Sequence, residues 1–143
     1  MDTWSENGAV AVITDPKGAN SKLPTLILSD PRAISGVVSA HVYGEPSTNM
    51  FTVGITGTNG KTTTTRLIAH IMKTVGHKVG FTTTDGVYIQ NRMLMRGDCT
   101  GPVSAEFVLK DPSVDFAVLE TARGGILRAG LGFHKCDMAV VTN

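Results

Sequence analysis

Short apolar runs alternate with helical repeats of apolar residues along the second part of the chain. The runs are rich in β-branched and aliphatic residues and have the length of buried strands. They cover residues 51–55, 78–83, 116–119 and 138–141. The segments between them predict helices over 62–75, 102–110 and 125–131. Strands that alternate with helices predict an α/β fold, with a parallel sheet flanked by helices.

The longest predicted helix has one apolar face. The residues that form it at helical spacing are Leu67, Ile68, Ile71, Met72 and Val75. Gly76 follows them and is typical of a helix C-terminus, where a left-handed residue is favoured. Further on, the apolar triplets 87–89 and 93–95 flank Gln90 and Asn91. This pattern predicts a hairpin arm with a tight turn.

The first part of the chain contains two apolar runs and one helical repeat. The runs at 9–14 and 25–29 predict two strands. Asp30 and Pro31 then offer a helix cap and a first-turn proline, and apolar residues recur at helical spacing as far as Val42. A β-β-α unit is therefore expected.

Turn-forming residues crowd the segment 44–49, which reads as a linker between these two patterns. We therefore expect one unit over 1–48 and a second domain over 49–143. At 143 residues the chain is long enough for a domain with a core but short for an enzyme with several substrates. A fragment of a longer protein is possible on length alone.

The strand at 51–55 runs into a glycine-rich loop and then into the longest helix. Such a turn points successive N–H groups at one spot, and the helix N-terminus adds partial positive charge, which suits a polyphosphate. Lys61 is expected to contact the β- and γ-phosphates of ATP, and the Thr62 hydroxyl to ligate Mg²⁺. The general P-loop pattern has a glycine where Ile55 stands. The predicted phosphate-binding residues are Gly57, Thr58, Asn59, Gly60, Lys61, Thr62 and Thr63.

A candidate acid follows the strand at 116–119. Because Mg²⁺ sits where the carboxyl ends of neighbouring strands open a crevice, Glu120 is predicted to be a metal ligand with Thr62. The alternative is a glutamate that caps the following helix. Arg123 and Arg128 offer planar forks for a carboxylate or the transferred phosphate, with solvated arginines as the alternative. Arg128 joins the loop lysine in the predicted catalytic set.

The amino-acid composition limits the classes of binding partner that we expect. A formal net charge of +1 and 17% charged residues give no electrostatic footprint for nucleic acid or a membrane surface, so small molecules are expected. Cys99 and Cys136 form no metal-binding or redox motif and read as reduced thiols. The N-terminus lacks the pattern of a signal peptide, so we expect a cytoplasmic protein.

Several segments resemble a known family. The octamer at 56–63 is similar to the phosphate loop of the Mur ligase superfamily, whose central domain has a P-loop NTPase-like sheet. Residues 82–89, 97–102 and above all 120–128 resemble the cyanophycin synthetase branch. Residues 8–50 resemble the end of the N-terminal domain of the UDP-N-acetylmuramyl-tripeptide synthetases.

The resemblance implies an ATP-dependent amide-bond ligase that phosphorylates a carboxylate and lets an amino group attack the acyl phosphate. It implies that Lys61 contacts the phosphates while Thr62 and Glu120 hold Mg²⁺. Candidate substrate contacts are Asp98, Thr100 and Arg123. The partners would be a small-molecule or peptide carboxylate and an amino acid. The family's remaining motifs and amino-acid-binding domain fall after Asn143, so we expect phosphate binding without ligase activity.

Two other hypotheses stay open. The segment 98–101 matches the short DxxG signal of GTPase switches, and Asn143 is placed to begin a guanine-specificity motif. That hypothesis leaves Glu120 without a role, and competition between GTP and ATP tests it. The other hypothesis is a non-catalytic remnant that binds phosphate only.

Overall fold

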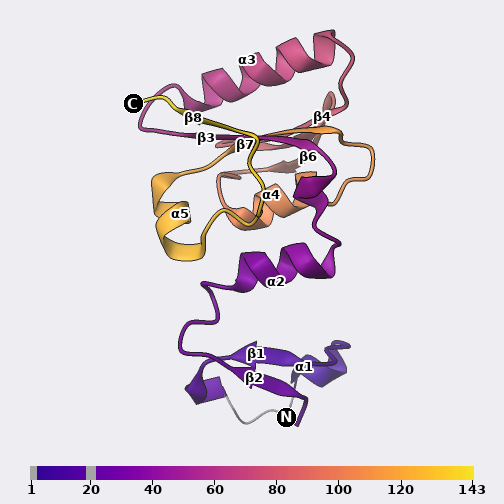
Figure 1. The fold of residues 1–143 in the computed structure, drawn as a ribbon, viewed down its shortest axis with the longest axis vertical. Coiled ribbons are helices and arrows are strands. Elements are labelled where there is room, and N and C mark those ends of the chain that lie inside the picture. Colours follow the sequence, from indigo (N-terminus) through magenta and orange to yellow (C-terminus); the bar gives the residue numbers. More distant parts are fainter. Residues whose placement is uncertain (1–2, 19–21) are drawn as a thin grey trace.

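The computed structural model describes residues 3–18 and 22–143. Two sheets lie at opposite ends of the long axis, and helix α2 (Ser35–Val42) lies between them (Figure 1). The small sheet pairs β1 (Val12–Thr14) with β2 (Thr25–Ile27) in parallel. The shortest helical segments are α1 (Thr3–Glu6), η1 (Pro16–Gly18) and η2 (Pro46–Thr48).

The larger sheet has six strands in the order β6-β5-β4-β7-β3-β8. In chain order they are β3 (Phe51–Thr56), β4 (Val79–Thr83), β5 (Gly86–Ile89), β6 (Arg92–Arg96), β7 (Phe116–Glu120) and β8 (Met138–Val141). Strands β4, β7, β3 and β8 run parallel, which confirms the predicted α/β fold. The predicted hairpin around Gln90 and Asn91 is also present. It extends the sheet as antiparallel β5 and β6 instead of standing apart as an arm.

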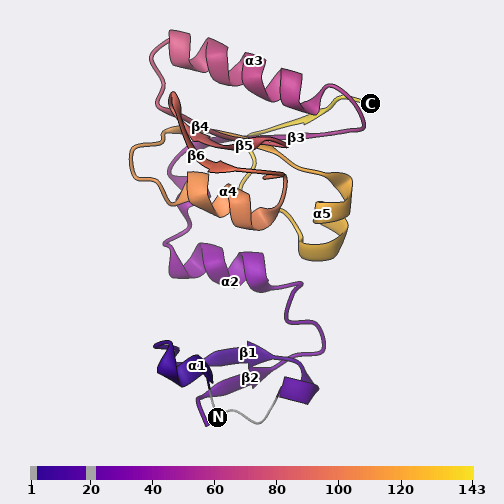
Figure 2. The ribbon, with the colours of Figure 1, turned by 180° about the vertical axis from the view of Figure 1, so that it is seen from behind.

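Helices cover both faces of this sheet. Helix α3 (Lys61–Thr74) lies on one face, and α4 (Pro102–Leu109) and α5 (Arg123–Ala129) lie on the other (Figures 1 and 2). Each face has its own apolar cluster, with Val118 of β7 on the α3 side and Leu119 on the α4 side. Strand β7 is therefore buried along its whole length. No helix in the described ranges has the length and apolar character needed to cross a membrane.

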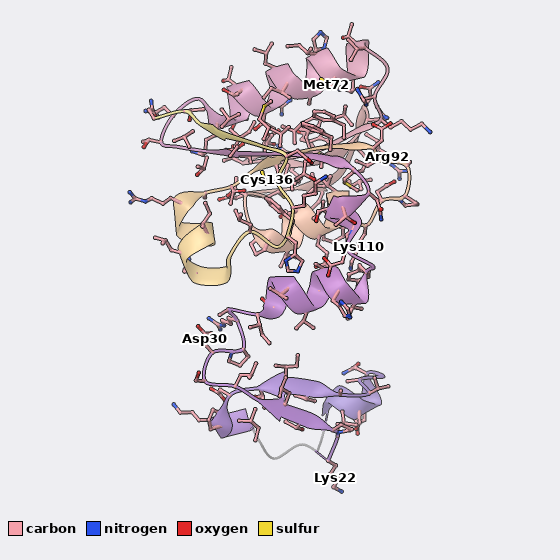
Figure 3. The ribbon with its side chains drawn as sticks, in the orientation of Figure 1. Lys22, Asp30, Met72, Arg92, Lys110 and Cys136 are labelled. Carbon is pink, nitrogen blue, oxygen red and sulfur yellow. The ribbon has the colours of Figure 1, made fainter. Side chains whose placement is uncertain are left out.

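The predicted apolar face of α3 is partly wrong. Ile68 and Met72, the latter labelled in Figure 3, pack against the sheet. Leu67, Ile71 and Val75, by contrast, are 57%, 48% and 66% exposed. The buried positions nearest the sheet are instead Thr65 and Ala69. Small side chains at these positions let the helix approach closely, so the inward face is rotated away from the largest residues. The predicted helix end is confirmed, since Gly76 has φ +103°.

The start of α2 also differs from the prediction at Asp30 and Pro31. The Asp30 carboxylate accepts the N–H groups of Arg32 at 3.1 Å and Ala33 at 3.3 Å, which closes a turn before the helix. The helix begins only at Ser35. Within the predicted linker, Ser47 is buried and its Oγ accepts the Lys135 N–H at 3.3 Å, so this segment packs against the larger unit. The division after residue 48 stays a prediction.

Candidate nucleotide-binding site

The loop Gly57–Gly60, called the glycine loop below, joins β3 to α3 at the carboxyl end of the parallel strands. Gly57 has φ +135° and Gly60 has φ +83°, both in the region that favours glycine. A Cβ on Gly57 would lie 2.3 Å from the Thr142 Oγ1 atom and 2.9 Å from its N atom. Ile55, by contrast, is a core residue of β3 with 1% exposure. This loop thus needs glycine at 57 and 60 but not at 55.

The Lys61 side chain folds back over the glycine loop. Its Nζ donates to the carbonyl oxygens of Gly57 at 2.9 Å and Thr58 at 3.0 Å. The hydrogen bond from Thr64 N to Gly60 O opens the helix, so the N–H groups of 61–63, Thr63 included, have no carbonyl partner within α3. The Lys61 ammonium and the N–H groups at the start of α3 both lie beside the glycine loop. Their positive polarity at this spot is the kind that binds phosphate.

Glu120 lies beside this spot because β7 pairs with β3 in a register that sets Glu120 opposite Ile55. The Thr62 hydroxyl donates to Glu120 Oε2 at 2.8 Å. Glu120 is only 2% exposed, and its Oε1 has no hydrogen-bond partner among the described residues. Burial raises the pKa of Glu120, and the hydrogen bond from Thr62 and the positive charge of Lys61 oppose that rise.

This donor set fits a magnesium ion that also takes phosphate oxygens. The described residues contain no cluster of three or more histidine, cysteine or acidic side chains that could hold a metal by themselves. Mg²⁺ is commonly bound through one or two carboxylates together with substrate phosphates and water. Glu120 Oε1, which has no partner within 3–18 and 22–143, and the Thr62 hydroxyl could offer hard oxygen ligands of that kind beside the start of α3.

Asp98 and Thr100, the predicted substrate contacts, lie at the edge of the same site. Asp98 Oδ1 accepts the Thr100 hydroxyl at 2.8 Å and the Thr100 N–H at 3.3 Å. Thr100 is buried, and its carbonyl oxygen accepts a hydrogen bond at 3.2 Å from the N–H of Ala122, two residues after the end of β7. Their segment is also tied to β4, because Cys99 N donates to Thr83 O at 3.0 Å. Both residues are thus held near Glu120.

The two candidate arginines occupy different places. Arg123 lines a cavity of about 430 Å³ that also has Thr56, Gly57, Thr58 and Asn143 in its wall, so it faces the glycine loop. Arg128 is not among the lining residues of this cavity. Its Nε donates to the carbonyl of Gly124 within α5 at 2.9 Å. The structure therefore brings Arg123 to the loop, whereas a catalytic role for Arg128 stays a prediction.

Sequence reasoning missed two neighbours of the glycine loop. Asn143 Oδ1 accepts the N–H groups of Thr58 at 3.3 Å and Asn59 at 3.0 Å, which orders the middle of the loop. The Thr84 hydroxyl lies 3.2 Å from that of Thr62. Thr84 directly follows β4, and Asn143 comes two residues after the end of β8, so both lie at this edge of the sheet. A position just after a predicted strand could have marked both residues as candidates for the site. The sequence could not show how the strands pair, and so could not show which side chains meet.

Comparison with protein families matches residues 55–143 to the Mur ligase middle domain. The matched region begins in β3 and includes the glycine loop, Glu120 and all of β8.

Curated relatives extend this similarity. The cyanophycin synthetase of Trichormus variabilis is 54% identical over 114 residues, which are 79% of this chain and 13% of the relative. That of Crocosphaera subtropica is 63% identical over 91 residues, or 64% of this chain and 10% of the relative. The UDP-N-acetylmuramoyl-L-alanyl-D-glutamate–2,6-diaminopimelate ligase of Streptomyces avermitilis is 33% identical and matches 95% of this chain, but only 28% of its own length. The chain thus spans between 10% and 28% of the length of these relatives.

A solved structure of a UDP-N-acetylmuramoyl-L-alanyl-D-glutamate–2,6-diaminopimelate ligase has the same fold. It superposes with a TM-score of 0.81 over 97% of this chain and 29% of that chain, at 24% sequence identity. The shared fold includes most of the small β1–β2 unit as well as the larger sheet.

Proposed function

The chain belongs to the Mur ligase family, and on that premise we propose that it binds ATP with Mg²⁺ at the glycine loop, as part of an ATP-dependent amide-bond ligase. The observation that carries the proposal is the buried Glu120 carboxylate: one oxygen accepts a hydrogen bond from Thr62, and the other has no partner in the part of the chain that the structure describes. A buried anion without a partner is costly, and a bound cation beside the phosphates removes that cost.

Each residue of the site has a distinct task in this proposal. The N–H groups of 61–63 at the start of α3 and the Lys61 ammonium hold the β- and γ-phosphates, and the phosphate oxygens replace the two loop carbonyls that Lys61 now contacts. The N–H groups of Thr58 and Asn59 join them by exchanging Asn143 Oδ1 for a phosphate oxygen. Thr62 and Glu120 hold Mg²⁺, which when bound neutralises phosphate charge and polarises the γ-phosphoryl group. Arg123 faces the loop and offers a planar fork to a carboxylate.

The chemistry needs no side-chain nucleophile. A substrate carboxylate oxygen attacks the γ-phosphorus, the bond to the β–γ bridging oxygen breaks and ADP leaves. An amino group then attacks the acyl carbon of the acyl phosphate, inorganic phosphate leaves, and the amine loses a proton as the amide forms. Such transfers depend on positioning and charge neutralisation, which are the properties of Lys61, Thr62 and Glu120.

The relatives indicate the class of substrate. One name gives a UDP-N-acetylmuramoyl dipeptide and 2,6-diaminopimelate, and the others give cyanophycin. We therefore propose a small-molecule or peptide carboxylate and an amino acid as substrates. Because the chain spans so little of these relatives, we expect it to form no amide alone. Measurable ATP-dependent amide formation by this chain would overturn that expectation.

Equilibrium binding of ATP by the chain, with and without Mg²⁺, tests the proposal. Lys61→Ala removes a charged donor, so affinity should fall by about 1.5–3 kcal/mol, or more than tenfold. Lys73→Ala is the matched control, since Lys73 lies in the last turn of the same helix and contacts Asn91 at 3.2 Å. It should bind ATP like the wild type. Absence of ATP binding by the wild-type chain would refute the proposal.

The GTPase hypothesis is tested in the same assay. In the structure the Asp98 side chain closes on Thr100, the third residue of its own DxxG segment. We expect ATP to compete more strongly than GTP for the glycine loop. Tighter binding of GTP would favour the switch hypothesis over the ligase.

A further inference from the structure

The Thr84 hydroxyl stands at one end of a hydrogen-bonded row that leads to the buried acid. Thr84 Oγ1 lies 3.2 Å from Thr62 Oγ1, which in turn donates to Glu120 Oε2 at 2.8 Å. Thr84 comes directly after β4, whereas Thr62 is in the first turn of α3 and Glu120 ends β7. Three different elements thus place these oxygens in one row beside the phosphate spot.

The single hydroxyl hydrogen of Thr62 limits how this residue can bind a metal ion. A threonine hydroxyl that coordinates a cation does so through a lone pair, so its single hydrogen must point to another acceptor. In the structure that acceptor is Glu120 Oε2. If both Glu120 oxygens bind the cation, the Thr84 oxygen, 3.2 Å from Thr62 Oγ1, is within reach as the new acceptor.

We propose that Thr84 is a positioning residue for the magnesium site, because its oxygen accepts the Thr62 hydrogen and so aims the Thr62 lone pair at the ion. This inference rests on the proposed function, since it concerns the same MgATP site. In this proposal Thr84 is not itself a ligand of the ion. It acts through Thr62, in the way that partners behind a first ligand orient that ligand.

An ion-pair network holds the Thr84 turn in place. The Asp85 carboxylate accepts hydrogen bonds from Thr83 Oγ1 at 2.6 Å and Tyr88 Oη at 2.5 Å. It also accepts one from Arg66 Nη2 at 2.6 Å. Arg66 lies on α3 one turn after Thr62, so a single helix carries both the proposed ligand and the anchor of its neighbour.

Additional contacts fix the orientation of this network. Arg66 donates to Tyr88 Oη at 3.2 Å and lies over the Tyr88 ring, 5.2 Å from its centroid. The ring stacks on Phe81 of β4 with centroids 4.6 Å apart. The Asp85 carbonyl accepts the Gly97 N–H at 3.0 Å. The turn that presents Thr84 is therefore tied to the helix, the sheet and the segment that leads to Thr100.

The hydrogen bonds from Thr83 and Tyr88, with the Arg66 charge, hold the pKa of Asp85 well below its usual range. The Arg66–Asp85 pair is nevertheless 47% exposed on each side, and exposed pairs add little stability. Loss of this pair should therefore change the position of the Thr84 turn while changing the free energy of unfolding little. A binding assay measures that change in position better than a melting curve does.

The test compares Thr84→Val with Thr84→Ser in the 143-residue chain. Valine keeps the shape but removes the acceptor, whereas serine keeps the hydroxyl. Because Thr84 is exposed, both variants should melt like the wild type. We expect Thr84→Val to weaken MgATP binding roughly tenfold and to leave ATP binding in EDTA unchanged, as for other partners behind a metal ligand. Thr84→Ser should keep MgATP affinity within about twofold of the wild type.

Two controls complete the design. Thr74→Val removes a threonine hydroxyl at the far end of α3, where it donates to His70 O at 2.9 Å, and should leave MgATP affinity unchanged. Asp85→Asn weakens the anchor without touching the row and should cost a smaller factor, roughly threefold.

The outcomes separate the inference from the proposed function. Wild-type MgATP affinity in Thr84→Val overturns the inference alone. An equal loss with and without Mg²⁺ also overturns it, because Thr84 would then act on the phosphates or the loop. A wild-type chain that binds no MgATP overturns the proposed function, and the inference with it.

Discussion

Replacing Glu120 with glutamine separates the cost of burying its charge from its role as a metal ligand. Leaving a buried acceptor unpaired costs about 1–3 kcal/mol, and more when it is charged. Glu120 Oε1 is such an atom in the described structure. Glutamine keeps the shape and still accepts the Thr62 hydroxyl, but carries no charge. Without Mg²⁺ we therefore expect E120Q to be more stable by about 1 kcal/mol, or about 3 °C in Tm for a chain of this length.

With MgATP bound, we expect the wild type to become more stable than E120Q. A ligand present at about 100 times its Kd stabilises the native state by about 2.7 kcal/mol. MgATP should thus raise the wild-type Tm by roughly 8 °C. E120Q lacks the carboxylate that the ion needs, so its shift should fall below about 2 °C. Thermal melts followed by circular dichroism, with and without MgATP, measure both effects.

Glu106→Gln is the matched control, because Glu106 pairs with Lys110 on the surface of α4, away from the site. It should keep the full MgATP shift and lose at most about 1 kcal/mol of stability. A full MgATP shift in E120Q would refute the metal role of Glu120. A magnesium-free E120Q that is less stable than the wild type would refute the reasoning about the buried charge.

Three further predictions concern two backbone positions and the dependence of the free energy of unfolding on pH under acid conditions. Gly57→Ala should cost about 2 kcal/mol or more in urea unfolding, because its Cβ would meet Thr142 Oγ1 at 2.3 Å and φ is positive; a neutral effect would contradict the loop geometry. Gly132→Ala should cost a similar amount in the same experiment, since its φ is +75° and its Cβ would lie 2.7 Å from the Pro102 Cβ; a neutral effect would count against this close contact. The lowered pKa of Asp85 means that its stabilisation is complete above about pH 3.9 and is lost as pH falls toward the folded-state pKa. Asp85→Asn should therefore lower stability by about 1 kcal/mol at pH 7 and by progressively less under acid, as melts from pH 7 to 2 would measure; a constant difference would argue against the linkage.

The helix faces show where sequence patterns stop being sufficient. Helical spacing alone placed Leu67, Ile71 and Val75 on the inward side of α3, yet all three are exposed. Periodicity gives the period of a pattern, but the angle at which a helix rests on a sheet also depends on which side chains permit close approach. Ala69 and Thr65 permit it here.

The arginines illustrate a second limit. A guanidinium suits anion binding wherever it points, so the sequence prediction gave Arg128 a catalytic role and Arg123 only a substrate contact without knowing which of them faces the loop. Helix α5 turns Arg123 toward the glycine loop, whereas the Arg128 Nε bonds to the carbonyl one turn earlier. Which of the two faces the loop is decided by the phase of a seven-residue helix, which the sequence only roughly delimits.

The sequence by itself determined the features that depend on neighbours along the chain. Strand, glycine loop and helix follow from local backbone preferences, and Gly57 and Gly60 predicted the tight turn that their positive φ values in the structure confirm. Only the tertiary structure decided which distant oxygens meet. Glu120 reaches Thr62 across 58 positions because β7 pairs with β3 in one register, and Thr84 joins them because β4 pairs with β7. A shift of one residue in either pairing would turn these side chains to the opposite face of the sheet, so the site depends on packing along whole strands.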